Sequence, residues 1–126
     1  MGLPKVHRLR ERRDFRAVYE QGIRRYSPHL ILRAFLAVNP EHSASTDDLK
    51  PTAIGISIGR KVSKKAVIRN RIKRQIKGAI REMLPSLAPG WKIVIIVKPE
   101  AIECKYEHFL RELNKLLKEA TIINGH

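Results

Sequence analysis

The stretch KKAVIRNRIKRQIKGAIRE, residues 64–82, combines two patterns that decide the fold. Eight of its nineteen residues are Lys or Arg, and the only acid is its last residue, Glu82. Its apolar residues recur every three or four positions, as on the buried face of an amphipathic helix, and the series continues to Met83: Ile68, Ile72, Ile76, Ala79 and Ile80. The stretch is therefore predicted to be a helix with one buried face and one cationic face.

The segments on either side of this helix are typical of β-strands. TAIGISIG, residues 52–59, alternates β-branched with small residues, and WKIVIIVKP, residues 91–99, is nearly continuous in apolar residues. Two strands joined through a helix are predicted to pair in parallel. The second strand has no polar face, so we expect it to lie centrally in the sheet.

The rest of the chain completes an α+β pattern. A helix is predicted over 14–22, one or two strands over 26–38, a loop over 39–51 and a second amphipathic helix over 103–120. These segments predict a two-layer sandwich in αβββαβα order. A small mixed sheet of about four strands would pack with three helices, all on one side of it. We expect a single domain, 1–126, with flexible ends at 1–7 and 121–126.

Charge indicates the class of partner. The chain has 26 Lys and Arg against 12 Asp and Glu, a formal net charge of +14. The segment 60–81 holds ten cations and no acid, and such clustering favours a dedicated polyanion-binding site. The single cysteine, Cys104, fits a reducing compartment. Since no apolar run is long enough to span a membrane and no secretory signal is recognisable, we expect a cytoplasmic protein without membrane contact.

Residues suited to catalysis or to metal binding are not arranged in any recognisable motif. The five histidines are scattered, and none lies at ligand spacing from another or from Cys104. The acids are dispersed among cations on predicted helices, where ion pairing accounts for them. We therefore predict no catalytic residue, no metal site and no cofactor motif in the protein itself.

Two groups of residues are candidates for binding nucleic acid. Arginine forks suit phosphate oxygens, and Arg69, Arg71 and Arg74 lie near one helix end. The loop before the helix adds four more cations: Arg60, Lys61, Lys64 and Lys65.

The aromatic group lies nearer the N-terminus. Phe15, Tyr19 and Phe35 are accompanied by Arg12, Arg13, Arg16 and Arg33, a combination that can stack on unpaired RNA bases. An ordinary core contact is the alternative for these aromatic side chains.

The motif Arg69-Asn70-Arg71-Ile72-Lys73-Arg74, after a strand and a Lys-rich loop, closely resembles the protein subunit of bacterial ribonuclease P. The resemblance spans residues 7–120 and includes Arg8-Leu9, Asp14-Phe15 and the strand ending before Pro99. It implies an RNA-binding subunit that promotes removal of the 5′ leader from precursor tRNA. It also implies a left-handed βαβ crossover and a ribosomal protein S5 domain 2-like fold.

The resemblance also implies partners and site residues. The partners would be a catalytic RNA subunit and precursor tRNA, with no protein partner, and the RNA–protein holoenzyme would require Mg²⁺. RNA-binding residues would be Arg60, Lys61, Lys64, Lys65, Arg69, Asn70, Arg71, Lys73, Arg74 and Lys77. A leader-binding cleft would contain Arg12, Phe15, Arg16, Tyr19, Arg33 and Phe35.

The chain departs from the family pattern at two places. The loop 60–65 is one residue longer than in many members, and Arg33 stands where some members carry a cleft tyrosine. Leader contact at that position would be electrostatic, with Phe35 on the same strand face. Three alternatives fit less well: a ribosomal or general structured-RNA-binding protein, a self-sufficient nuclease with clustered carboxylates, and a helix-turn-helix DNA-binding protein.

Overall fold

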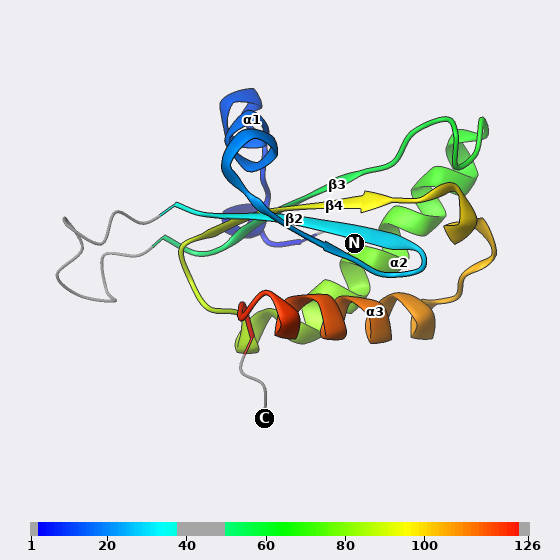
Figure 1. Ribbon diagram of the computed structural model, residues 1–126. Coiled ribbons are helices and arrows are strands. Elements are labelled where there is room, and N and C mark those ends of the chain that lie inside the picture. The colour runs from blue at the N-terminus through cyan, green and yellow to red at the C-terminus, as the bar shows by residue number, and fades with distance from the viewer. Residues whose placement is uncertain (1–2, 38–49, 124–126) are drawn as a thin grey trace, which may run out of the picture.

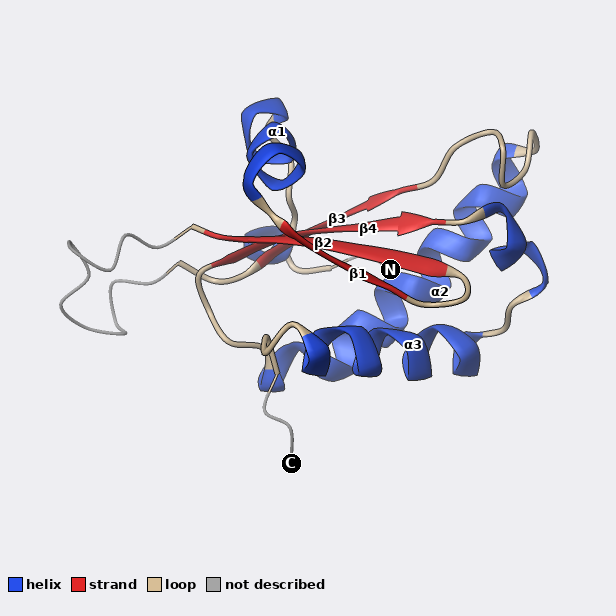
Figure 2. Ribbon diagram, viewed as in Figure 1, coloured by secondary structure: helices blue, strands red, loops and turns tan. Residues whose placement is uncertain are grey.

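The computed structural model describes residues 3–37 and 50–123, which form a four-stranded sheet with helices on both faces (Figures 1 and 2). The helices are α1 (Arg12–Gln21), α2 (Ala66–Met83) and α3 (Tyr106–Glu119). The strands are β1 (Ile23–Tyr26), β2 (Leu30–Leu36), β3 (Ala53–Ser57) and β4 (Trp91–Val97). Short 3-10 turns are η1 (Lys5–His7), η3 (Leu84–Ser86) and η4 (Pro99–Glu103). The predicted α+β class and element order are confirmed.

The sheet has the strand order β1-β2-β4-β3. β1 pairs with β2, and β2 with β4, in antiparallel registers, whereas β3 and β4 are parallel and are joined through α2. The predicted parallel pair is therefore confirmed, and so is the central position of β4. Ile93, Val94 and Ile95 are all buried because helices cover both faces of that strand.

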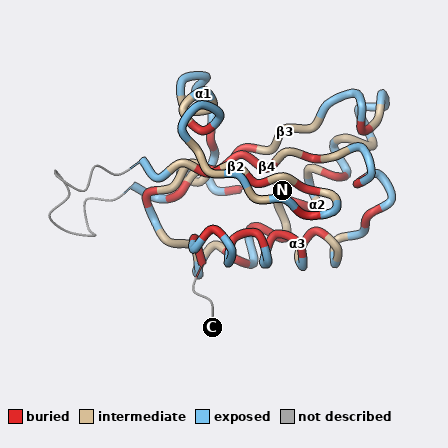
Figure 3. The backbone as a smooth tube through the Cα atoms, in the orientation of Figure 1, coloured by how far each residue is buried: buried red, intermediate tan, exposed pale blue. Residues whose placement is uncertain are grey.

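Successive β4 side chains point to opposite faces of the sheet and enter two separate apolar clusters. Ile93 and Ile95 pack against α2 and α3 in the main core. Val94 instead packs with Val18 of α1 in a smaller cluster on the other face. Figures 1 and 3 show α1 on one side of the sheet and α2 and α3 on the other. The expectation of all three helices on one side is wrong for α1.

An ion pair and a buried side chain hold α1 on its face of the sheet. Lys92 Nζ of β4 lies 2.5 Å from Asp14 Oδ1 in the first turn of α1. A carboxylate in that turn also interacts favourably with the helix dipole. Val18 is fully buried one turn further along. The position of α1 therefore depends on residues of β4, and its ion pair joins positions 78 apart in the sequence.

The remaining differences from the predicted elements are in their bounds. β1 begins at Ile23, before the predicted strand segment, because Ile23 to Tyr26 pair with Ala34 to Ile31 across the hairpin. The loop predicted over 39–51 lies mostly outside the described residues. Near the two ends, Leu3, Ile122 and Ile123 are buried in the main core. Within 3–37 and 50–123, no helix has the length and apolar character needed to cross a membrane.

Candidate nucleic-acid interface

The cationic face of α2 lies opposite its buried isoleucines. Ile72, Ile76 and Ile80 are buried in the main core, whereas Asn70 and the arginines 71 and 74 are exposed. Among the described residues, none of the ion pairs within 4.0 Å involves a cation of α2 or of the loop 60–65. This positive charge is therefore free to attract phosphate groups.

The loop before α2 is anchored by one buried side chain and one arginine. Val62 is buried, and its N–H donates to Gly59 O at 3.1 Å. Arg69 Nη1 donates to Ser63 O at 2.8 Å, which joins the loop to the first turn of the helix. The loop thereby holds four exposed cations beside the start of α2: Arg60, Lys61, Lys64 and Lys65.

The residues of the Arg-Asn-Arg motif have different partners within the fold. Arg69 is bonded to the loop, and Arg71 Nη2 donates to Ile102 O at 3.1 Å, on the connection that follows β4. Asn70 and Arg74 make no side-chain hydrogen bond within the described part of the chain. The two bonded arginines are therefore oriented by backbone carbonyls, while Asn70 and Arg74 keep all their polar groups for a ligand.

A hollow of about 220 Å³ lies beside the edge strand β3. Its apolar wall includes Leu9 and Phe15, and its four cations come from the N-terminal segment and from α2: Arg8, Arg10, Lys73 and Lys77. The N-terminal segment is held there because Leu9 N–H donates to Ile54 O at 3.1 Å. The hollow therefore joins the predicted aromatic site, through Phe15, to the predicted phosphate-binding helix, through its two lysines.

The N-terminal arginines of this hollow were missing from the predicted site. The sequence showed that the first 25 residues are basic, and Arg8 was part of the family resemblance. Only the bridge between Arg8 and Ile54 brings this segment to the edge of β3, however. A strand pairing of this range cannot be read from local periodicity.

Phe15 is both a core residue and a wall of the hollow. Its half-buried ring packs against the smaller cluster and lies directly over Gly55 of β3. A Cβ at Gly55 would lie 2.6 Å from Phe15 Cζ, so only glycine leaves room for the ring in this position. The two interpretations of this aromatic residue, core contact and ligand contact, are therefore compatible.

Tyr19 and Arg33 form a second group on the same face of the sheet. The Arg33 guanidinium lies 4.6 Å from the centre of the Tyr19 ring, and its Nη2 donates to Tyr19 O at 2.7 Å. Tyr19 is 37% exposed. Phe35 follows two positions after Arg33, on the same face as predicted, and packs against the smaller cluster. Arg12 and Arg16 are exposed on α1, and neither lines the hollow.

The lining of the hollow is suited to binding a single-stranded nucleic acid. The side chains that line the hollow include cations, apolar groups and one aromatic ring, but no carboxylate or histidine. Cations beside an aromatic ring match the phosphates and bases of a single strand. The fold and this surface therefore define the class: a small α+β protein that binds nucleic acid.

The chain belongs to the ribonuclease P family, because the family model described as Ribonuclease P matches residues 3–121. It is 56% identical over 126 residues to the ribonuclease P protein component of Microcystis aeruginosa, with both chains covered in full. The corresponding protein of Rippkaea orientalis is also 56% identical, over 100% of this chain and 95% of the relative. The protein is thus a subunit of ribonuclease P, with a role in tRNA 5′ processing.

Solved structures of this family share the fold. The ribonuclease P protein of Staphylococcus aureus superposes with a TM-score of 0.77 at 23% identity, covering 95% of this chain and 100% of that one. A ribonuclease P protein from Thermotoga maritima, in complex with 1-(4-fluorophenyl)-2-thiourea, superposes with a TM-score of 0.72 at 26% identity. That match covers 88% of this chain and 97% of the other. The recognised resemblance is confirmed by both sequence and fold.

Proposed function

We propose that the protein contacts the catalytic RNA subunit of ribonuclease P through the loop 60–65 and the exposed side of α2, and the 5′ leader of precursor tRNA through the hollow beside β3. Cleavage chemistry would belong to the RNA subunit and its Mg²⁺. The observation that carries the proposal is the set of unneutralised cations around a hollow whose lining contains no carboxylate or histidine. These partners would place the protein in the cytoplasm, where precursor tRNA is processed.

The RNA subunit suits the α2 surface because exposed polar and cationic side chains recur along the helix. Arg69 and Arg71 are oriented by the carbonyls of Ser63 and Ile102, so they present their remaining N–H groups in defined directions. Asn70 lies between them in the sequence and Arg74 follows them in α2, and both side chains are exposed. Oriented donors favour a folded RNA with phosphates at fixed positions over an unstructured polyanion.

The 5′ leader suits the hollow because the leader is single-stranded. Phe15 lines the hollow with aromatic surface for a base, and four cations line it as well for the phosphates: Arg8, Arg10, Lys73 and Lys77. Tyr19 and Arg33 extend the aromatic and cationic surface across the sheet, and the exposed Arg12 and Arg16 would contribute through their charge.

The test is reconstitution with the cognate RNA subunit and precursor tRNA at low Mg²⁺. We expect cleavage when protein and RNA are combined and no cleavage by highly purified protein alone. Metal-dependent cleavage by the protein without RNA would contradict the assignment of the chemistry to the RNA. Cleavage at low Mg²⁺ by the RNA alone, unchanged by added protein, would contradict the role of the protein as its cofactor.

Variants separate the two surfaces. Arg74→Ala should weaken binding of the RNA subunit, and Phe15→Leu should weaken binding of precursor tRNA more than that of mature tRNA. Lys118→Ala, which removes an exposed cation from α3, is the matched control. If Lys118→Ala weakens RNA binding as much as Arg74→Ala, binding depends on net charge alone, and a general RNA-binding role is the better account.

A further inference from the structure

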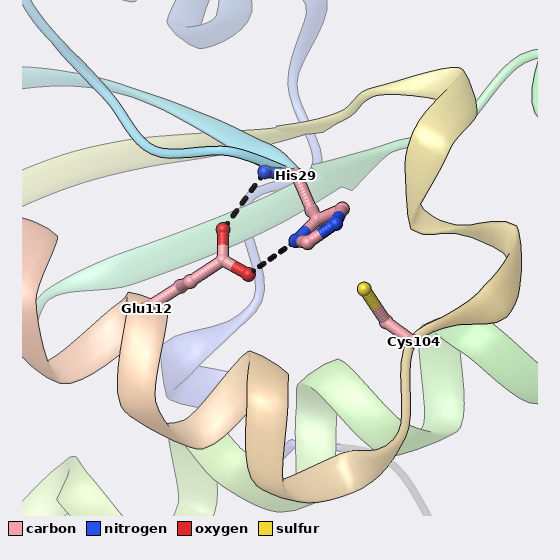
Figure 4. Close-up of side chains that lie close together, drawn as sticks. All are labelled: His29, Cys104 and Glu112. Carbon is pink, nitrogen blue, oxygen red and sulfur yellow. Dashed lines mark hydrogen bonds and ion pairs between the residues drawn. The ribbon is translucent and has the colours of Figure 1, made fainter.

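Three side chains with metal-binding atoms meet on the opposite side of the sheet from α1: His29, Cys104 and Glu112 (Figure 4). One potential ligand atom from each lies within 4.8 Å of those of the other two. His29 lies in the β1–β2 turn, Cys104 follows η4, and Glu112 is in the middle of α3. Because the three come from different elements, their spacing in the sequence gave no sign of this cluster.

Glu112 is held in place by hydrogen bonds to one of its two oxygens. Oε1 accepts from Ser27 Oγ at 2.5 Å and from the His29 N–H at 2.9 Å. Oε2 has one partner, His29 Nδ1, at 2.7 Å. Burial opposes ionisation of this carboxyl, but the hydrogen bonds from Ser27 and His29 outweigh it and lower the pKa of Glu112. A charged carboxylate therefore presents one oxygen to the imidazole.

Cys104 completes the cluster and is a buried residue, 7% exposed. A thiolate beside a carboxylate is unfavourable unless a cation lies between them. A divalent ion would balance one thiolate and one carboxylate, with a neutral imidazole as the third ligand.

We propose that His29, Cys104 and Glu112 form a site for one zinc ion. Sulfur, nitrogen and oxygen ligands in this combination suit Zn²⁺, and three protein ligands leave a fourth position for water. Tetrahedral coordination would bring the ligand atoms to roughly 3.3–3.7 Å from one another, which requires side-chain movement of about 1 Å. Half-buried His29 leaves one side of the site open to solvent.

The hydrogen bonds around the cluster fit this role. Zinc would take Oε2 of Glu112, while Ser27 and the His29 N–H keep Oε1 in place as outer partners of a ligand. The hairpin is itself fixed to the end of the sheet, because the N–H of Lys98, the residue after β4, donates to His29 O at 3.0 Å. The ion would connect the β1–β2 hairpin, the connection after η4 and α3, and so stabilise the fold independently of RNA.

The test uses the full-length, chelator-treated protein and Co²⁺ as a spectroscopic probe. We expect one Co²⁺ per chain, with a thiolate-to-cobalt charge-transfer band in the near ultraviolet that Zn²⁺ abolishes by competition. Cys104→Ser should remove the band. His29→Gln and Glu112→Gln should each weaken binding more than 100-fold, and Ser27→Ala about 10–100-fold through the orientation of Glu112.

The matched control is Glu103→Gln, which removes the carboxylate next to Cys104 in the sequence and should keep the band. A second measurement needs no variant: Zn²⁺ should slow alkylation of Cys104 in the wild-type protein and raise its Tm. A wild-type protein with no charge-transfer band and no zinc effect on alkylation would overturn the proposal, and Cys104 would be a core residue only. A band that survives in His29→Gln at unchanged affinity would overturn it equally.

Discussion

Replacing Gly55 by alanine tests the contact that shapes the hollow beside β3. A Cβ at this position would lie 2.6 Å from Phe15 Cζ and 2.9 Å from Phe15 Cε1. Since carbon atoms in contact are normally about 3.5–4.0 Å apart, the ring would have to move by about 1 Å. The backbone itself tolerates alanine, because the φ of Gly55 is not positive.

The expected magnitude follows from this overlap. Overpacking of this kind costs about 1–3 kcal/mol, so Gly55→Ala should lower the free energy of unfolding by that amount. In a Phe15→Ala background the ring is absent, and the same substitution should stabilise by about 0.4–1 kcal/mol through the unfolded state. The two positions should therefore show a coupling energy of about 2 kcal/mol.

Urea denaturation of the four proteins in this cycle measures the coupling directly. Gly59→Ala is the control, because a Cβ there would meet no atom within 4 Å and its φ is not positive. A Gly55→Ala protein as stable as Gly59→Ala, or one equally destabilised with and without the Phe15 ring, would refute the reasoning. Since Phe15 lines the hollow, Gly55→Ala should also weaken precursor tRNA binding.

Further predictions concern charge, the hairpin and the aromatic group. Lys73→Ala should reduce the dependence of log K on log salt concentration for RNA binding by about 0.7–0.9. The control is Lys115→Ala, which removes a cation whose Nζ lies 4.0 Å from a carboxylate oxygen on α3 and should leave this salt dependence unchanged. If the two variants show the same salt dependence, the interface lies elsewhere. Ser27→Ala should lower the free energy of unfolding by about 1–3 kcal/mol, because Oε1 of Glu112 loses a buried donor; an unchanged urea midpoint would contradict this. Arg33→Leu should weaken binding of precursor tRNA but not of mature tRNA in a filter assay, and equal losses would give Arg33 a structural role.

Much of the fold could be predicted, because the spacing of apolar residues in a helix or strand shows which of its faces is buried. The spacing of Ile72, Ile76 and Ile80 identified the buried face of α2, and the apolar run of β4 identified a strand covered on both sides. Residue spacing also predicted the helix that forms α1. It could not show which face of the sheet α1 would cover, because both faces of β4 are apolar.

The class of partner and the family were also determined by the sequence alone. The charge of +14, its concentration in the loop and in α2, and the Arg69-Asn70-Arg71 order needed no coordinates. These are local features, and the physical reason is that phosphate binding depends first on charge density along one element.

Only the tertiary structure decided which distant residues share a site. The bridge between Arg8 and Ile54 adds the N-terminal segment to the hollow, and the packing of α1 over Gly55 adds Phe15. On the other face, the hairpin and α3 bring His29 to Cys104 and Glu112. Such contacts join positions up to 83 apart in the sequence. They depend on how the helices and strands pack together, and the periodicity within one element contains no information about that packing.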